Sequence, residues 1–173
     1  MTTKKMFHVF MMTLGAIALL TSAGCRTKGG YVGATIEEGT WVSGADDPMS
    51  GDFSSLPRVQ GVNFAPVYFA YDNYQIPASE NYKIDSVVSF LQGNNNVVLI
   101  VEGHCDERGT IEYNLSLGEY RAQSIRSYMS RAGISSSRIQ TTSYGKERPA
   151  VSGNNETAWS KNRRGEFALY RTR

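Results

Sequence analysis

Residues 97–110 read Val-Val-Leu-Ile-Val-Glu-Gly-His-Cys-Asp-Glu-Arg-Gly-Thr, and this stretch decides the fold. Residues 97–101 are a continuous apolar run, which is typical of a central strand buried on both faces. Residues 102–110 are polar and lead into a helical pattern. Ligand sites of open α/β sheets lie at the carboxyl ends of strands, and the N-terminus of a following helix offers free N–H groups to anions. We therefore expect a buried strand followed by a binding loop.

The residues before this stretch predict a strand and a helix. A β-branched and aromatic run at 67–71 indicates a strand. Apolar residues then recur at helical spacing between Pro77 and Gly93, which indicates an amphipathic helix. A strand, a helix and a strand in succession predict a parallel pair of strands.

The residues after the stretch predict a longer helix and two more strands. The helix is expected from Ile111 to Ala132, with Gly133 ending it. Strands are expected at 139–144 and 166–170. The order β-α-β-α-β-β predicts an α+β domain, a two-layer sandwich with the helices packed on one mixed sheet. The stripe of the second helix expected to face that sheet is Leu115, Gly118, Ala122, Ile125 and Met129.

The composition is that of an ordinary globular protein. The 173 residues are 40% hydrophobic and 20% charged, with a net charge of +2. These values argue against a fibre, a disordered chain or a protein with several membrane spans, and the length suits one folded domain. Basic residues cluster near the end of the chain, a pattern that suggests nucleic acid when taken alone. The export signal described next argues against nucleic acid as a partner.

The beginning of the chain carries the signals of an exported lipoprotein. Two lysines precede an apolar stretch at 9–20, which is too short to span a bilayer comfortably and is typical of a secretory signal. Small residues stand directly before Cys25, as at the sites where lipoprotein signal peptidase cleaves and the thiol carries lipid. We expect a signal peptide at 1–24, a lipidated Cys25 that begins a linker at 25–63, and a folded domain at 64–173.

Two features of the expected linker stay open. Arg26 follows the cysteine where aspartate would retain a lipoprotein at the inner membrane of some bacteria, so the outer membrane is favoured. The linker is rich in Gly, Ser and Asp, as in flexible connectors. Tyr31, Trp41 and Phe53 are unusual in such a segment, and either the domain or a partner is a candidate to receive them.

Polar residues of the second helix are expected to overlook the binding loop. Asn114 and Arg121 are about two turns apart on one face of that helix, facing the loop that carries Asp106. On the residues alone, an ion pair between Asp106 and Arg121 that ties the loop to the helix is favoured. A ligand site is the alternative.

Metal binding and catalysis have weak sequence signals here. His104 and Asp106 are spaced as two metal ligands, but no third and fourth stand at a suitable spacing, so we expect a hydrogen-bonded histidine at a strand end. Cys105 is expected to be a small buried hydrophobe. Ser116 or Cys105 with His104 would supply a nucleophile and a base, yet no nucleophile elbow or oxyanion-hole motif accompanies them. We expect a binding module that is not an enzyme and has no cofactor or metal.

Several blocks of sequence together carry a family resemblance. They lie at 67–69, 102–110, 112–119, 143–147 and 160–164. In content, order and spacing these blocks resemble the peptidoglycan-associated lipoprotein family, whose C-terminal domain is OmpA-like. The resemblance covers residues 67–173, and the lipoprotein leader agrees with it.

The resemblance implies a domain that binds the peptide stem of peptidoglycan without a covalent bond, chiefly at the free end of diaminopimelate. Asp106 is implied to bind the ammonium group of that residue and Arg121 its carboxylate, a contact that a guanidinium fork makes strongly. The sequence departs from the family pattern at Ala70, Tyr120 and Cys105. Further residues implied in the pocket are Asn114, Asp72, Tyr71, Cys105, Asn162 and Arg163, although Arg163 and Arg164 are equally well interpreted as a solvated cap on the last strand.

The resemblance also implies a place in the cell envelope. It implies the outer membrane as location, the β-propeller protein TolB of the Tol-Pal system as a partner, and roles in envelope integrity and cell division. The alternatives are a wall-binding OmpA-like lipoprotein outside that system, a flagellar stator component that keeps a membrane helix, an OmpA-type porin, for which the segment before Val67 is too short, and a peptidoglycan amidase.

Overall fold

A computed structural model of the chain describes residues 52–172. The expected signal peptide, Cys25 and the linker up to residue 51 lie outside these residues. Within 52–172, no helix is both long enough and apolar enough to cross a membrane.

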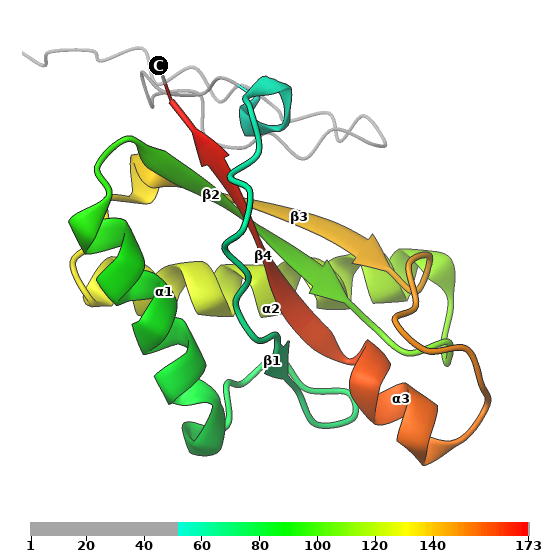
Figure 1. The fold of residues 1–173 in the computed structure, drawn as a ribbon. Helices are drawn as coiled ribbons and strands as arrows, with labels where there is room; N and C mark the ends of the chain where they lie inside the picture. Colours follow the sequence, from blue (N-terminus) through cyan, green and yellow to red (C-terminus); the bar gives the residue numbers. More distant parts are fainter. Residues whose placement is uncertain (1–51, 173) are drawn as a thin grey trace, which may run out of the picture. The chain divides into compact units, whose positions relative to one another are not determined.

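Four strands form one mixed sheet in the order β1-β4-β2-β3 (Figure 1). They are β1 at Val67–Tyr68, β2 at Val97–His104, β3 at Ile139–Gly145 and β4 at Arg164–Arg171. β2 pairs in parallel with β3 and antiparallel with β4, and β4 pairs antiparallel with β1. The expectation that β1 and β2 form a parallel pair is therefore wrong. They run in the same direction, but β4 lies between them.

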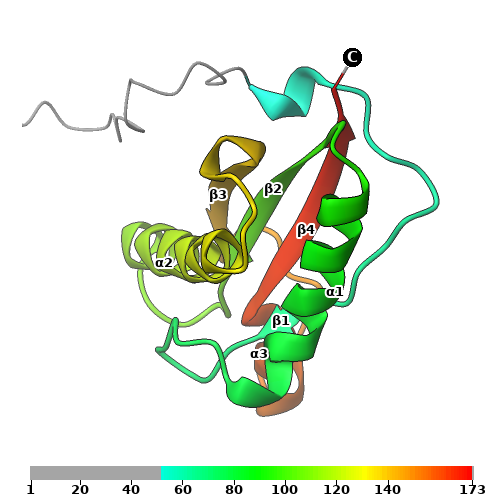
Figure 2. The same cartoon turned by 90° about the vertical axis from the view of Figure 1, so that its left-hand side faces the viewer.

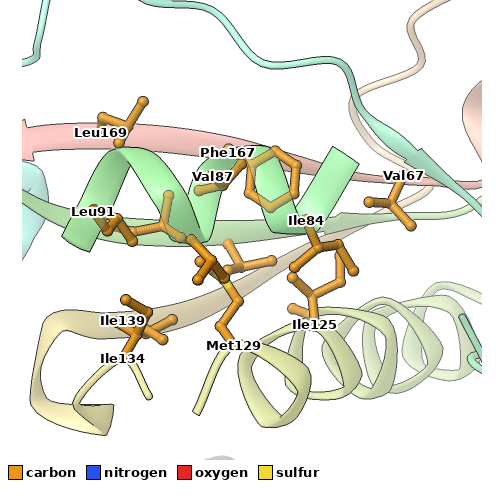
Figure 3. Close-up of a cluster of buried hydrophobic side chains, with 14 of the residues drawn as sticks. Val67, Ile84, Val87, Leu91, Ile125, Met129, Ile134, Ile139, Phe167 and Leu169 are labelled. Carbon is orange, nitrogen blue, oxygen red and sulfur yellow. The ribbon is translucent and has the colours of Figure 1, made fainter. Parts of the chain in front are cut away.

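Two long helices cover one face of this sheet, α1 at Asn81–Gly93 and α2 at Ile111–Arg131 (Figure 2). Their apolar sides meet the inward residues of the strands in the main core, which Figure 3 shows in close-up. The predicted stripe of α2 is correct except at its first member, because Leu115 is 37% exposed and Leu117 is buried in its place. The α+β class, with helices on one mixed sheet, is confirmed.

A third helix, α3 at Glu156–Asn162, is absent from the predicted order. It comes directly before β4 and lies at the end of the sheet where β1 is found (Figure 1). Asn155 caps it by accepting a hydrogen bond from the backbone N–H of Ala158. A helix of two turns carries too few apolar repeats for periodicity to reveal it, so the order is β-α-β-α-β-α-β.

The opposite face of the sheet is partly covered by residues expected to belong to the linker. Phe53 is buried there in a second apolar cluster with residues of β2 and β4. The backbone also pairs with β4, because Val59 donates to the carbonyl of Leu169 and Arg171 donates to that of Pro57, both at 2.9 Å. For residues 52–63 the linker interpretation is therefore wrong, and Phe53 docks on its own domain.

Two glycines set the distance between α2 and β2. A Cβ atom on Gly103 would lie 1.9 Å from the carbonyl oxygen of Gly118, and one on Gly118 would lie 2.2 Å from the hydroxyl oxygen of Ser143. Only glycine permits backbones to approach this closely. The close contact that the sequence predicts for Gly118 is confirmed, and it brings the face of α2 with Asn114 and Arg121 against the end of β2.

Candidate ligand-binding site

A cavity of about 50 Å³ lies at the end of β2, where the chain enters the loop before α2. The loop, the turn after β1, the face of α2 and Arg163, between α3 and β4, contribute its walls. Seven of the eight pocket residues expected from the sequence line it, and Asn162 does not. The seven are Tyr71, Asp72, Cys105, Asp106, Asn114, Arg121 and Arg163.

Arg121 is the deepest charged group of the cavity. Its side chain is fully buried, with no exposed surface. Its guanidinium donates to the backbone carbonyls of Asn73 at 2.9 Å, His104 at 2.8 Å and Ala70 at 3.2 Å, and to the sulfur of Cys105 at 3.3 Å. A guanidinium has five N–H groups, and these contacts leave one of them without a partner among the described residues.

Asp106 is the acidic group of the cavity, and it pairs with Arg108 and Arg163. The Arg108 side chain donates to both carboxylate oxygens, at 3.2 and 2.6 Å, and Arg163 lies 3.3 Å away. Burial alone would raise the pKa of Asp106, but the hydrogen bonds from Arg108 and Arg163 outweigh it and hold the pKa below its usual range. No salt bridge joins Asp106 to Arg121, so the predicted structural ion pair between them is wrong.

Arg108 lines the cavity between two aromatic rings, a position that sequence reasoning missed. Its guanidinium lies 3.9 Å from the ring centre of Tyr71 and 4.1 Å from that of Trp159 on α3. An arginine held between two aromatic faces gains from cation–π attraction as well as from its carboxylate partner. Because α3 was not predicted, nothing in the sequence indicated that Trp159 would meet the loop.

The remaining polar groups hold the loop in shape. The amide of Asn114 donates to the carbonyls of Arg108 at 2.8 Å and Thr110 at 3.0 Å. The hydroxyl of Tyr113 donates to the carboxylate of Asp72, whose backbone is left-handed at φ 53°. Asn114 therefore fixes the loop from behind, while Asp72 and Tyr113 join the two sides of the cavity.

Asn162 and Arg164, from the sequence block at 160–164, have structural contacts outside the cavity. The Asn162 side chain accepts from the backbone N–H groups of Ala150 and Val151 and donates back to the carbonyl of Val151, so it clamps the loop before α3. Arg164 is buried and pairs with Glu166 at 2.5 Å. The solvated-cap interpretation of Arg163 and Arg164 is wrong, since both guanidinium groups are buried.

His104 lies on the opposite face of the sheet from the cavity. Its ring packs against that of Tyr144 at a tilt of 34°, and within residues 52–172 neither ring nitrogen has a hydrogen bond of good geometry, the backbone of Arg148 offering only a weak contact, so the expected hydrogen-bonded histidine is not found. Its ligand atoms lie within 4.8 Å of those of Glu102 and Glu166, a group that excludes Asp106. Glu166 is already bound by Arg164, which also lowers the pKa of His104, so positive charge opposes a cation here.

We expect His104 to make the domain less stable in acid. Burial, reinforced by Arg164, lowers its pKa from 6.5 to about 4. The unfolded chain takes up a proton as the pH falls below 6.5 and the folded chain does so only near 4, so this window lowers the free energy of unfolding by about 3 kcal/mol. Urea unfolding at pH 7 and pH 4 should show this loss in the wild type, and His104→Leu should remove most of it.

Comparing the wild type with His104→Leu also separates the effect of His104 on acid stability from the effect of the neighbouring Glu102. Burial and the charge of Glu166 raise the pKa of Glu102, which favours the folded state as the pH falls. Glu102 is present in both proteins, so the difference between them reports on His104. A wild type that loses no more stability in acid than His104→Leu would contradict the assignment.

The described residues do not form a nucleophile and base pair of the kind considered from the sequence. Cys105 is buried, and burial raises the pKa of its thiol to about 11, which keeps it protonated. Its sulfur meets Arg121 on the cavity side, whereas the ring of His104 packs on Tyr144 across the sheet. The hydroxyl of Ser116 donates to the carbonyl of Glu112 on its own helix.

The sequence and the fold are similar to those of known proteins. The OmpA family model matches residues 68–163. A peptidoglycan-associated lipoprotein of Pasteurella multocida is 35% identical over 165 residues, which cover 95% of this chain and 99% of the relative. One of Haemophilus influenzae is 41% identical over 102 residues, covering 59% of this chain and 67% of the relative.

Solved structures show the same fold. The crystal structure of the peptidoglycan-associated lipoprotein from Burkholderia pseudomallei has a TM-score of 0.59 and 33% identity, covering 60% of this chain and 88% of that one. The periplasmic domain of Helicobacter pylori MotB has a TM-score of 0.54 at 17% identity, covering 61% and 70% of the two chains, which is a likeness of fold alone. These matches confirm the resemblance seen in the sequence.

Proposed function

Because the chain belongs to the OmpA family, we propose that it binds the peptide stem of peptidoglycan through the cavity at the end of β2. The observation that carries this proposal is that Asp106 and Arg121, from the loop and from α2, line one small cavity. The free end of diaminopimelate presents an ammonium and a carboxylate on a single carbon. A receptor for it needs an anion and a planar cation close together, and these two residues supply them.

The cavity suits the charged end of a stem in further ways. Asp106 is ionised at neutral pH, because its pKa lies below the usual range. Arg121 keeps one N–H group for a carboxylate after its contacts with the protein. Arg108 is the cation that a ligand ammonium must displace from Asp106, and Glu156, 4.0 Å from its guanidinium, offers a second anion to receive it.

We propose further that the chain links the outer membrane to the wall. The support is the sequence: a leader at 1–24 with Cys25 as the lipid attachment, and curated relatives named peptidoglycan-associated lipoprotein. TolB and a role in envelope integrity and cell division belong to the same proposal and rest on the family resemblance. The activity proposed is binding and not turnover.

The test is co-sedimentation of the full-length protein, held in mild detergent, with two purified walls. One wall carries diaminopimelate in its stems, and the other carries lysine, which lacks the side-chain carboxylate. We expect pelleting with the first and binding at least about tenfold weaker with the second, the loss expected for a charged hydrogen bond. Equal pelleting with both walls would show that the cavity does not recognise the diaminopimelate end, and pelleting with neither would refute wall binding.

A further inference from the structure

A groove of about 510 Å³ lies beside the cavity, on the outer side of the helices. Its walls are the loop after β1, the start of α1 and the exposed side of α2. The segment from Tyr71 to Ile76 borders both hollows, since Tyr71 and Asp72 line the cavity while Tyr74 and Ile76 line the groove.

We propose that this groove binds the glycan strand of the wall, at the N-acetylated disaccharide that carries the stem peptide. The inference rests on the proposed function, because it takes the end of the stem to be held in the neighbouring cavity. The groove is then a second subsite, which binds a neutral sugar, whereas the cavity binds the charged end of the peptide.

The aromatic side chains of the groove suit a sugar. The rings of Tyr74 and Tyr120 lie 5.6 Å apart, and these side chains are 49% and 53% exposed. A pyranose ring presents flat C–H faces that pack on such rings, and tyrosine leaves a hydroxyl for the polar rim of the sugar.

The polar side chains of the groove are also suited to a neutral, hydroxyl-rich ligand. The side chains of Gln75, Asn81 and Ser127 make no hydrogen bond within the described part of the chain, so their donors and acceptors are free. Among the lining residues Arg131 is the only charged one, and none carries a carboxylate. Cleavage of a glycosidic bond generally uses a pair of carboxyl groups, so the groove is suited to hold a glycan and not to cut it.

The cavity and the groove lie next to each other along the chain. Only Asn73 stands between Asp72, which lines the cavity, and Tyr74, which lines the groove. A stem has two residues between diaminopimelate and the sugar, roughly 7 Å when extended, so a stem whose end is held in the cavity has its sugar end outside the cavity. The loop between them is fixed, because the carbonyl of Asn73 accepts from Arg121 at 2.9 Å.

The experiment compares two soluble ligands by calorimetry with the full-length protein in mild detergent. One is the stem tripeptide that ends in diaminopimelate, and the other is the same tripeptide on its disaccharide. We expect the sugar to tighten binding about threefold to tenfold, the scale of an aromatic contact. Tyr74→Ala and Tyr120→Ala should abolish this gain and leave the affinity for the bare tripeptide unchanged, and Tyr120→Phe should keep most of it.

Tyr82→Ala is the matched control, because Tyr82 is 64% exposed and does not line the groove. Equal affinity of the wild type for both ligands, or a sugar gain that persists in both alanine variants, would overturn the glycan site and leave the proposed function intact. Loss of TolB binding in those variants with the sugar gain unchanged would assign the groove to a protein partner and overturn it too. Absence of binding to either ligand would refute the proposed function and this inference together.

Discussion

Replacing Arg121 with alanine is expected to lower the free energy of unfolding by about 3–5 kcal/mol, the range for breaking a buried charged hydrogen-bond network. The guanidinium is fully buried and ties three segments together: the turn after β1 through Ala70 and Asn73, the end of β2 through His104, and α2 itself. Alanine leaves these carbonyls buried without a donor, which carries its own desolvation penalty for each group. Urea unfolding of the two proteins at pH 7 measures the effect.

Two further variants define the cause. Arg121→Lys keeps the charge but has no planar fork, so we expect it to recover less than half of the loss. Arg126→Ala, on the same helix, removes a half-buried arginine whose one hydrogen bond, to the carbonyl of Ser136 at 3.2 Å, is exposed, and it should change stability by no more than about 0.5 kcal/mol. If Arg121→Ala unfolded at the same urea concentration as Arg126→Ala, the network would not stabilise the fold.

This structural role changes how Arg121 variants are to be interpreted. From the sequence, Arg121 is only one side of a ligand contact, and loss of binding in Arg121→Ala would seem to identify the site. In the structure the same side chain holds the walls of the cavity, through Asn73 and His104. Loss of binding in this variant would therefore combine a missing ligand contact with a displaced loop.

The sequence predicts the elements with strong local signals and fails where long-range pairing decides. The apolar run of β2 and the periodic pattern of α2 locate both elements within a few residues of their observed bounds. The place of β4 between β1 and β2 is decided by pairing between residues far apart in the chain, and strand patterns do not encode it. The last strand begins at Arg164, two residues earlier than the alternating pattern indicates.

The sequence indicates which residues line the candidate site, but it does not indicate which other side chains those residues contact. The family blocks point to Asp106, Arg121 and Asn114, and all three line the cavity. Periodicity cannot say that Asp106 bonds to Arg108, since residues two apart in a loop have no fixed geometry. Nor could it find Trp159, because the short helix that carries it has a weak pattern and meets the loop only in three dimensions.

Asp106→Asn is expected to be the most specific disruption of wall binding. It removes the negative charge for the ligand ammonium and keeps a side chain of the same shape. Loss of one partner of a buried charge pair costs about 2–5 kcal/mol, so binding to the diaminopimelate tripeptide should weaken at least about 30-fold in calorimetry at pH 7. The fold should tolerate the change better than Arg121→Ala, because Arg108 and Arg163 keep other contacts with Tyr71, Phe69 and Glu156.

Two neighbouring residues make this prediction sharp. Glu107→Gln removes the adjacent carboxylate, which only accepts from the Trp159 ring at 3.1 Å, and should leave affinity within about twofold of the wild type. Arg108→Gln removes the cation that competes for Asp106 and should bind as tightly as the wild type or more tightly. An affinity loss in Arg108→Gln as large as that in Asp106→Asn would mean that the ligand needs the Asp106–Arg108 pair intact, and the ammonium would then have to be placed elsewhere in the cavity.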